Sequence, residues 1–138
     1  MTLLPLRILI IEDNEQNRYL LTFLLEKRGH AVQSAIDGAS GIRKAQQWQP
    51  DLILLDIQLP TMHGYDVAAE LRRHASTAHI PIVAVTSYAM PGDRERAIES
   101  GCDGYVEKPI DPDTFVMQVE AYCGSAESGG RCGSGSGC

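Results

Sequence analysis

Short apolar runs alternate along the chain with longer stretches in which apolar residues recur at helical spacing. Runs such as LRILII, LILLDI and IPIVAVT lack regular polar alternation, which is typical of parallel strands covered by helices on both faces. HAVQSA and GYVEK are weaker strand patterns. Together the runs predict five strands, at residues 6–11, 30–35, 52–57, 80–86 and 104–108.

Helical patterns fill the intervals after these strands. The stretch NRYLLTFLLEKRG closes with two basic residues and Gly29, which is a signal for a helix C-terminus, and Gly101 repeats the glycine stop. Asp111 is a plausible N-cap for the last helix, with Pro112 at its first helical position. The predicted helices lie at residues 17–29, 38–50, 65–75, 92–101 and 111–123.

Strict alternation of strand and helix predicts an α/β fold, a flavodoxin-like (βα)5 doubly wound sandwich. It has a five-stranded parallel sheet with helices on both faces. A chain of 138 residues is expected to form one domain, which we place at residues 1–123. Residues 124–138, GSAESGGRCGSGSGC, have almost nothing to bury and predict a flexible Gly/Ser-rich tail.

Composition and charge narrow the function classes. The chain carries 18 acidic against 12 basic residues, a net charge of −6, which disfavours direct binding to nucleic acid or an anionic membrane. The apolar N-terminus is interrupted by Pro5 and Arg7 and is too short to span a bilayer, so we expect a cytoplasmic protein. The four cysteines form no C-x-x-C pair and predict unpaired thiols.

Polar residues that could bind a ligand or take part in a reaction follow four of the five predicted strands. The carboxyl ends of parallel strands meet at one edge of the sheet, where ligands bind. Each residue alone has an ordinary structural role as a cap, a turn residue or a favourable charge at a helix end. Their conjunction predicts one site, made by Glu12, Asp13, Asp56, Thr86, Ser87 and Lys108.

Three neighbouring carboxylates repel one another unless a cation neutralises them. Oxygen ligands without histidine or cysteine favour Mg²⁺, with Mn²⁺ as the alternative. Lys108 and Thr86 suit phosphate oxygens, so Asp56 is a candidate nucleophile that forms an acyl phosphate. We expect Asp56 to lie at the mouth of its strand, not fully buried, and to be kept ionised by the metal and Lys108.

Four segments, ILIIEDNEQNR, DLILLDIQLPTMHG, IPIVAVTSYAM and GCDGYVEKPID, together resemble receiver domains of bacterial two-component response regulators. The resemblance covers roughly residues 6–122 and is closest to stand-alone receivers of the DivK type and to receivers of hybrid kinases. It implies a single-domain response regulator that accepts a phosphoryl group from a histidine kinase or a phosphotransfer protein. Such a protein is a signalling phosphoacceptor with self-catalysed phosphorylation and dephosphorylation, not a turnover enzyme.

The resemblance also assigns roles around the phosphoacceptor. It implies that Asp56 is phosphorylated, that Asp13 binds Mg²⁺ directly and Glu12 through water, and that Gln58 lends its backbone carbonyl to the metal. Lys108 is expected to pair with the phosphoryl group. The bond from Lys108 to Pro109 is often cis in this family.

The resemblance further implies a switch made by Thr86 and Tyr105. Thr86 moves toward the phosphoryl oxygen and the Tyr105 ring turns inward, a local charge change that biases a two-state element. The responding surface, through which a downstream protein would bind, is the fourth helix, fifth strand and fifth helix, here residues 91–100, 105–108 and 111–122. Tyr88 and Gln58 flank the site and are expected to tune the phosphoryl lifetime. The oligomeric state is expected to be a monomer or a weak dimer.

Three alternatives stay open from the sequence. A flavin-binding protein of the same topology would cradle phosphate after the first strand, but the loop EDNEQN would repel it. A hydrolase of the haloacid dehalogenase type would have a second aspartate two residues after the nucleophile, where this chain has Gln58. A receiver-type module that binds partners without phosphorylation, or a receiver fragment of a hybrid kinase, remains as the third.

Overall fold

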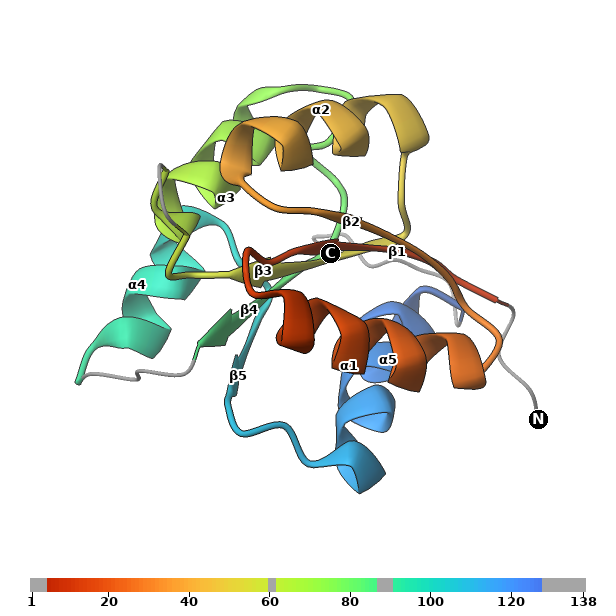
Figure 1. Cartoon of the computed structure of the whole chain (residues 1–138). Helices are drawn as coiled ribbons and strands as arrows, with labels where there is room; N and C mark the ends of the chain where they lie inside the picture. The colour runs from red at the N-terminus through yellow and green to blue at the C-terminus, as the bar shows by residue number, and fades with distance from the viewer. Residues whose placement is uncertain (1–4, 60–61, 87–90, 128–138) are drawn as a thin grey trace.

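The computed structural model describes residues 5–59, 62–86 and 91–127, and in them strands and helices alternate as predicted (Figure 1). The bounds agree with the predicted ones to within two residues, except at the end of the last helix. The elements are β1 (Arg7–Ile11), α1 (Glu15–Lys27), β2 (Ala31–Ala35), α2 (Gly38–Trp48), β3 (Leu52–Asp56), α3 (Gly64–Arg73), β4 (Ile82–Thr86), α4 (Asp93–Ser100), β5 (Gly104–Glu107) and α5 (Pro112–Glu127).

All five strands form one parallel sheet in the order β2-β1-β3-β4-β5. The chain therefore moves outward from β1 in one direction to β2 and then in the other through β3, β4 and β5. This is the doubly wound, flavodoxin-like order, so the predicted fold class is confirmed. The order also places β1, β3 and β4 inside the sheet, with β2 and β5 at its edges.

The sheet separates two hydrophobic cores. Alternate residues of each strand point to opposite faces, so Ile8 and Ile10 pack toward α1 and α5, while Leu9 and Ile11 pack toward α2, α3 and α4. All four of these side chains are fully buried. Figure 1 shows α1 and α5 on one side of the sheet and α2 and α3 on the other. Burial on both faces explains why these strands are apolar without alternation.

The helix ends follow local signals in the sequence. Asn14 accepts a hydrogen bond of 2.9 Å from the backbone N–H of Asn17 and caps α1, which therefore begins two residues earlier than predicted. The glycine stops are confirmed, because Gly29 and Gly101 have φ angles of 95° and 116°. Residues with a Cβ adopt this left-handed conformation only at a cost.

Helix α5 begins at Pro112 as predicted, and the Asp111 carboxylate accepts a hydrogen bond of 3.0 Å from the backbone N–H of Asp113. The helix continues through residues 124–127, beyond the boundary predicted for the domain. Residues 128–138 lie outside the described part of the chain, so a flexible tail there stays a prediction. Of the cysteines, Cys102 is a buried free thiol.

A buried polar cluster ties α5 to the loop between α1 and β2. Glu120 accepts hydrogen bonds from Arg28, at 2.7 and 3.1 Å, and lies 2.7 Å from Nε2 of His30. The other ring nitrogen of His30 accepts the backbone N–H of Leu6 at 3.0 Å. Burial opposes ionisation of Glu120, but the hydrogen bonds from Arg28 and His30 outweigh it and lower the pKa of this carboxyl.

Among the helices in the described part of the chain, none is both long enough and apolar enough to cross a membrane.

Candidate functional site

The C-terminal ends of four strands bring the predicted polar residues together. Asp56 is the last residue of β3 and Thr86 is the last residue of β4, whereas Glu12 follows β1 directly and Lys108 follows β5. Because the strands are parallel, all four ends lie at one edge of the sheet. The chemistry at this edge is therefore set by residues that are far apart in sequence.

Three carboxylates form the centre of this edge. One oxygen from each of Glu12, Asp13 and Asp56 lies within 4.8 Å of the others. Glu12 and Asp56 are buried, whereas Asp13 is exposed, so the cluster faces solvent on the Asp13 side. A donor set made only of carboxylate oxygens fits Mg²⁺ or Mn²⁺ and does not suit the softer metals that prefer nitrogen or sulfur ligands.

Asp56 is more buried than expected. The residue is 5% exposed, and its Oδ1 accepts a hydrogen bond of 3.0 Å from the backbone N–H of Gln58. The expectation that Asp56 is not fully buried was therefore wrong. The start of α3 folds back on the end of β3: the N–H of Gly64 donates to the Ile57 carbonyl at 2.9 Å, and a Cβ on Gly64 would lie 2.5 Å from Cα of Ile57.

This burial changes the acidity of Asp56. Burial is the main reason why the pKa of Asp56 is raised from 3.8 to about 7, and the neighbouring Glu12 carboxylate contributes to this rise. The N–H of Gln58 and the charge of Lys108 act in the opposite direction without cancelling the effect. Asp56 thus gives up its proton near neutral pH unless additional positive charge comes close.

Lys108 makes its direct contact with Glu12. Its Nζ donates a hydrogen bond of 2.8 Å to Oε1 of Glu12, and the two side chains are 10% and 3% exposed. Lys108 thus acts on Asp56 through its charge, while its ammonium pairs with the neighbouring acid. Its backbone N–H donates to the Thr86 carbonyl at 2.7 Å, and the bond from Lys108 to Pro109 is cis.

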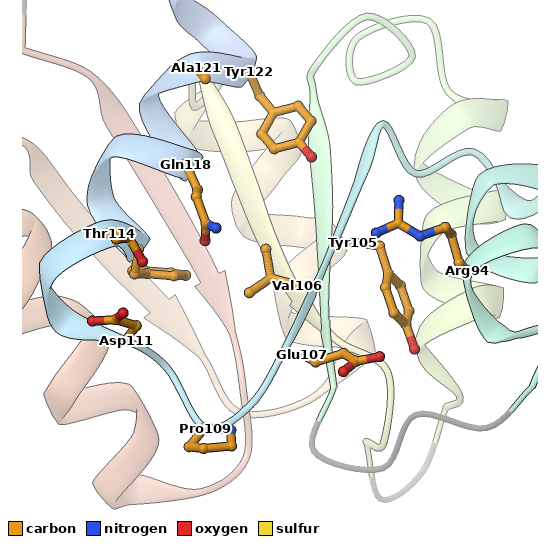
Figure 2. A pocket seen from close by; sticks show the side chains of 11 residues that line it. Arg94, Tyr105, Val106, Glu107, Pro109, Asp111, Thr114, Gln118, Ala121 and Tyr122 are labelled. Atoms are coloured by element: carbon orange, nitrogen blue, oxygen red, sulfur yellow. The ribbon is translucent and has the colours of Figure 1, made fainter.

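Thr86 and Tyr105 are both buried, at 1% and 8% exposure. The Tyr105 ring lies among core residues, and in the described part of the chain its hydroxyl has no hydrogen-bond partner. The guanidinium of Arg94, on α4, lies 5.5 Å from the centre of this ring (Figure 2). Burial raises the pKa of Tyr105. The near-site predictions for Ser87 and Tyr88 fall outside the described residues.

A groove of about 680 Å³ runs between α4, β5 and α5 (Figure 2). It lies along β5, which is an edge strand of the sheet. The groove is lined by Arg94, Tyr105, Val106, Glu107, Phe115 and Tyr122, among others. Each of the three segments predicted to respond to phosphorylation therefore contributes at least one residue to this groove, and Tyr105 connects it to the interior.

The comparisons with known proteins agree with this arrangement. Residues 8–120 match the model of the response regulator receiver domain, which covers most of the chain. The chain belongs to this family. The receiver domain is 39% identical over 123 residues to the polar-differentiation response regulator DivK of Brucella anthropi, a match that spans 89% of this chain and 100% of that protein. It is 40% identical to DivK of Brucella ovis over 86% of this chain and 97% of that one.

Several solved structures have the same fold as this receiver domain. One is the receiver domain of sensor histidine kinase PA1611 from Pseudomonas aeruginosa PAO1, with a magnesium ion in its active site cleft. Its TM-score is 0.80 with 30% identity, over 88% of this chain and 99% of that one. A CheY-like receiver domain protein from Methanospirillum hungatei JF-1 has a TM-score of 0.83 with 25% identity, over 92% of this chain and all of that one.

Two contacts of the receiver domain's acidic pair were not anticipated from the sequence. Nη1 of Arg18 donates hydrogen bonds of 3.0 Å to the backbone carbonyls of both Glu12 and Asp13. The backbone N–H of Asn14 donates to Oε2 of Glu12 at 3.1 Å. The segment EDNEQNR contains all these residues, but sequence spacing alone does not reveal that the Arg18 side chain turns back from α1 toward the preceding loop.

Proposed function

We propose that this receiver domain accepts a phosphoryl group on Asp56 and thereby controls the binding of a protein partner. The donor is the phosphohistidine of a histidine kinase or of a phosphotransfer protein. The observation that carries the proposal is the buried Asp56 at the end of β3, clustered with Glu12 and Asp13 and close to the Lys108 ammonium. Such an arrangement presents a carboxylate oxygen beside groups that suit a metal ion and a phosphoryl group.

In the proposed reaction a carboxylate oxygen of Asp56 forms a new bond to phosphorus. The bond from phosphorus to the donor's imidazole nitrogen breaks, and that nitrogen keeps the electron pair. Lys108 and Thr86, at the neighbouring strand ends, are suited to bind the phosphoryl oxygens. Hydrolysis of the acyl phosphate by water resets Asp56, so the chain is a signalling phosphoacceptor and not a turnover enzyme.

Glu12, Asp13, Asp56 and the backbone carbonyl of Gln58 are the groups that would hold Mg²⁺. The three carboxylates, with oxygens within 4.8 Å of one another, fit this ion. When bound, Mg²⁺ would supply positive charge that favours ionised Asp56 and offsets the charge of the phosphoryl group. Support for the ion also comes from the PA1611 receiver domain, whose structure contains magnesium in its active site cleft.

Phosphorylation would change the charge balance next to Lys108. A phosphoryl group adds between one and two negative charges at neutral pH, so Lys108, now paired with Glu12, would gain a stronger partner on Asp56. The Lys108 backbone, directly after β5, is hydrogen-bonded to Thr86 of β4, and Tyr105 of β5 contacts Arg94 of α4. These contacts offer a route from the charge change to the groove between α4, β5 and α5.

Similarity to DivK response regulators supports a phosphorelay role, and we propose a cytoplasmic location for it. A receiver fragment of a hybrid kinase is the second candidate, because one similar structure is the receiver domain of a sensor histidine kinase. We propose that the domain acts as a monomer or a weak dimer and has no direct nucleic-acid or membrane partner, in keeping with its net charge of −6.

The test is the intact mass of the protein after incubation with acetyl phosphate and Mg²⁺. The expected result is one phosphoryl adduct that is lost with EDTA and in Asp56→Asn. The matched control is Asp51→Asn, because Asp51 precedes β3 at its opposite end, where it accepts the Arg7 N–H at 2.8 Å. This control is expected to be phosphorylated like the wild type.

An adduct that persists in Asp56→Asn would contradict the proposed acceptor. An unmodified wild type that still binds Mg²⁺ in a separate titration would favour a receiver that binds partners without phosphorylation.

A further inference from the structure

The acidic pair of the receiver domain has a geometry that an extended chain does not give. Successive side chains of an extended strand point to opposite faces. Glu12 and Asp13 are adjacent, yet a carboxylate oxygen of each lies within 4.8 Å of one from Asp56. The backbone achieves this by bending at Asp13, two residues after the end of β1. The contacts that fix this bend therefore determine whether both carboxylates can bind the same ion.

The bend is held from α1 by Arg18. Its Nη1 donates hydrogen bonds of 3.0 Å to the carbonyl of Glu12 and to the carbonyl of Asp13. One side-chain atom thus fixes the two peptide groups on either side of the bend. On the other side Glu12 is anchored through its backbone N–H, which donates to the Ala35 carbonyl at 3.0 Å. Asp13 itself is exposed and has less packing to hold it.

We infer that Arg18 is a positioning residue of the metal site, which holds the bend so that Glu12 and Asp13 can bind the same divalent cation. The inference rests on the proposed function, because it assumes that this cluster binds Mg²⁺. Partners that orient the ligands of a metal without touching it typically contribute 10- to 100-fold in affinity. Arg18 is such a partner, because it contacts the backbone carbonyls of Glu12 and Asp13 and not their carboxylates.

The charge of Arg18 acts against its positioning role, which makes the sign of the effect informative. A guanidinium close to the cluster repels a second cation, so removing the charge alone would tighten Mg²⁺ binding. Removing the hydrogen bonds would loosen the bend and weaken Mg²⁺ binding. A weaker affinity after neutralisation of Arg18 is therefore explained by positioning and not by electrostatics.

The experiment is a calorimetric titration of the unphosphorylated, metal-free protein with MgCl₂, for wild type, Arg18→Met and Arg18→Lys. We expect Arg18→Met to raise the Kd roughly tenfold and Arg18→Lys, which keeps the charge and a donor, to recover part of the loss. The matched control is Arg73→Met, which removes the same charge from the last turn of α3, where the side chain is 69% exposed. Its Kd is expected to match the wild type.

Thermal unfolding in EDTA separates positioning from general damage, because a positioning role predicts a larger loss in Mg²⁺ affinity than in metal-free stability. An unchanged or tighter Kd for Arg18→Met overturns the inference, and so does a lysine variant as weak as the methionine variant. If Arg18→Met does not fold, a Kd of Arg18→Lys equal to that of the wild type overturns it. A wild type that binds no Mg²⁺ instead contradicts the proposed function itself.

Discussion

Replacing Asp56 with asparagine is expected to stabilise the metal-free protein at neutral pH. Burial holds the pKa of Asp56 at about 7, against 3.8 for the ordinary group. Between these two values the folded state binds a proton that the unfolded state has lost, so the stability of the wild type falls as the pH rises through this window. Asparagine does not ionise, so the stability of Asp56→Asn does not fall in this way as the pH rises.

The size of the effect follows from the shift in pKa. One unit corresponds to about 1.4 kcal/mol, so a carboxylate shifted from 3.8 to about 7 costs the fold about 4 kcal/mol at pH 8 and about 2 kcal/mol at pH 5. Asparagine keeps an oxygen that can accept the Gln58 N–H, and its amide can donate to the neighbouring Glu12. The advantage of Asp56→Asn should therefore grow by about 2 to 3 kcal/mol between pH 5 and pH 8.

The assay is urea unfolding in EDTA at both pH values, with Asp51→Asn as the control at the other end of β3. The control should show no comparable growth of its difference from the wild type. Adding Mg²⁺ at pH 8 should stabilise the wild type more than Asp56→Asn, because a ligand that binds only the folded state adds to its stability. An Asp56→Asn variant that is equally or less favoured at pH 8 than at pH 5 would refute the reasoning.

Two further predictions concern the other buried charges. Lys108→Met should destabilise the fold by about 3 kcal/mol in urea unfolding, because it leaves the Glu12 carboxylate buried without its cation. The control Lys27→Met, at an exposed position on α1, should have little effect on stability. Equal stability of the two variants would contradict the importance of this pair. Glu120→Gln should be less stable than the wild type at neutral pH, because the folded pKa of Glu120 lies below 4.5 and its ionisation stabilises the fold above that value. The deficit should shrink as the pH falls through the folded pKa, and a deficit that is unchanged at pH 3 would argue against this account.

The sequence was sufficient to predict the topology and the location of the site. Strands that are apolar at every position must be covered on both faces. When such strands alternate strictly with helices along the chain, the expected fold is a parallel, doubly wound sheet. In such a sheet the residues after each strand meet at one edge, which correctly brought Glu12, Asp13, Asp56 and Lys108 together. These conclusions depend only on the periodicity of apolar residues and on the order of strands and helices along the chain, both of which can be read from the sequence.

The details of the site could not be read in this way. The 5% exposure of Asp56 depends on how neighbouring groups pack around the end of β3, which periodicity does not describe. Lys108 acts on Asp56 through its charge, as expected, but the hydrogen bond of its ammonium to Glu12 was not predicted, because the choice between two adjacent carboxylates depends on side-chain geometry. The role of Arg18 depends in turn on a bend at Asp13 that no spacing rule predicts.

Helix α4 has only one buried residue, Ala97, and is held to its neighbours partly by arginine side chains over aromatic rings: Arg94 over Tyr105 and Arg96 over Tyr65. Substitutions on its outer face therefore cost the fold little free energy, since few apolar contacts are lost. The partner surface that we propose at α4 can therefore change in sequence while the sheet and the acidic cluster stay under strict structural constraint. Under this proposal, mutations that alter partner choice and mutations that alter the fold would fall largely on different residues.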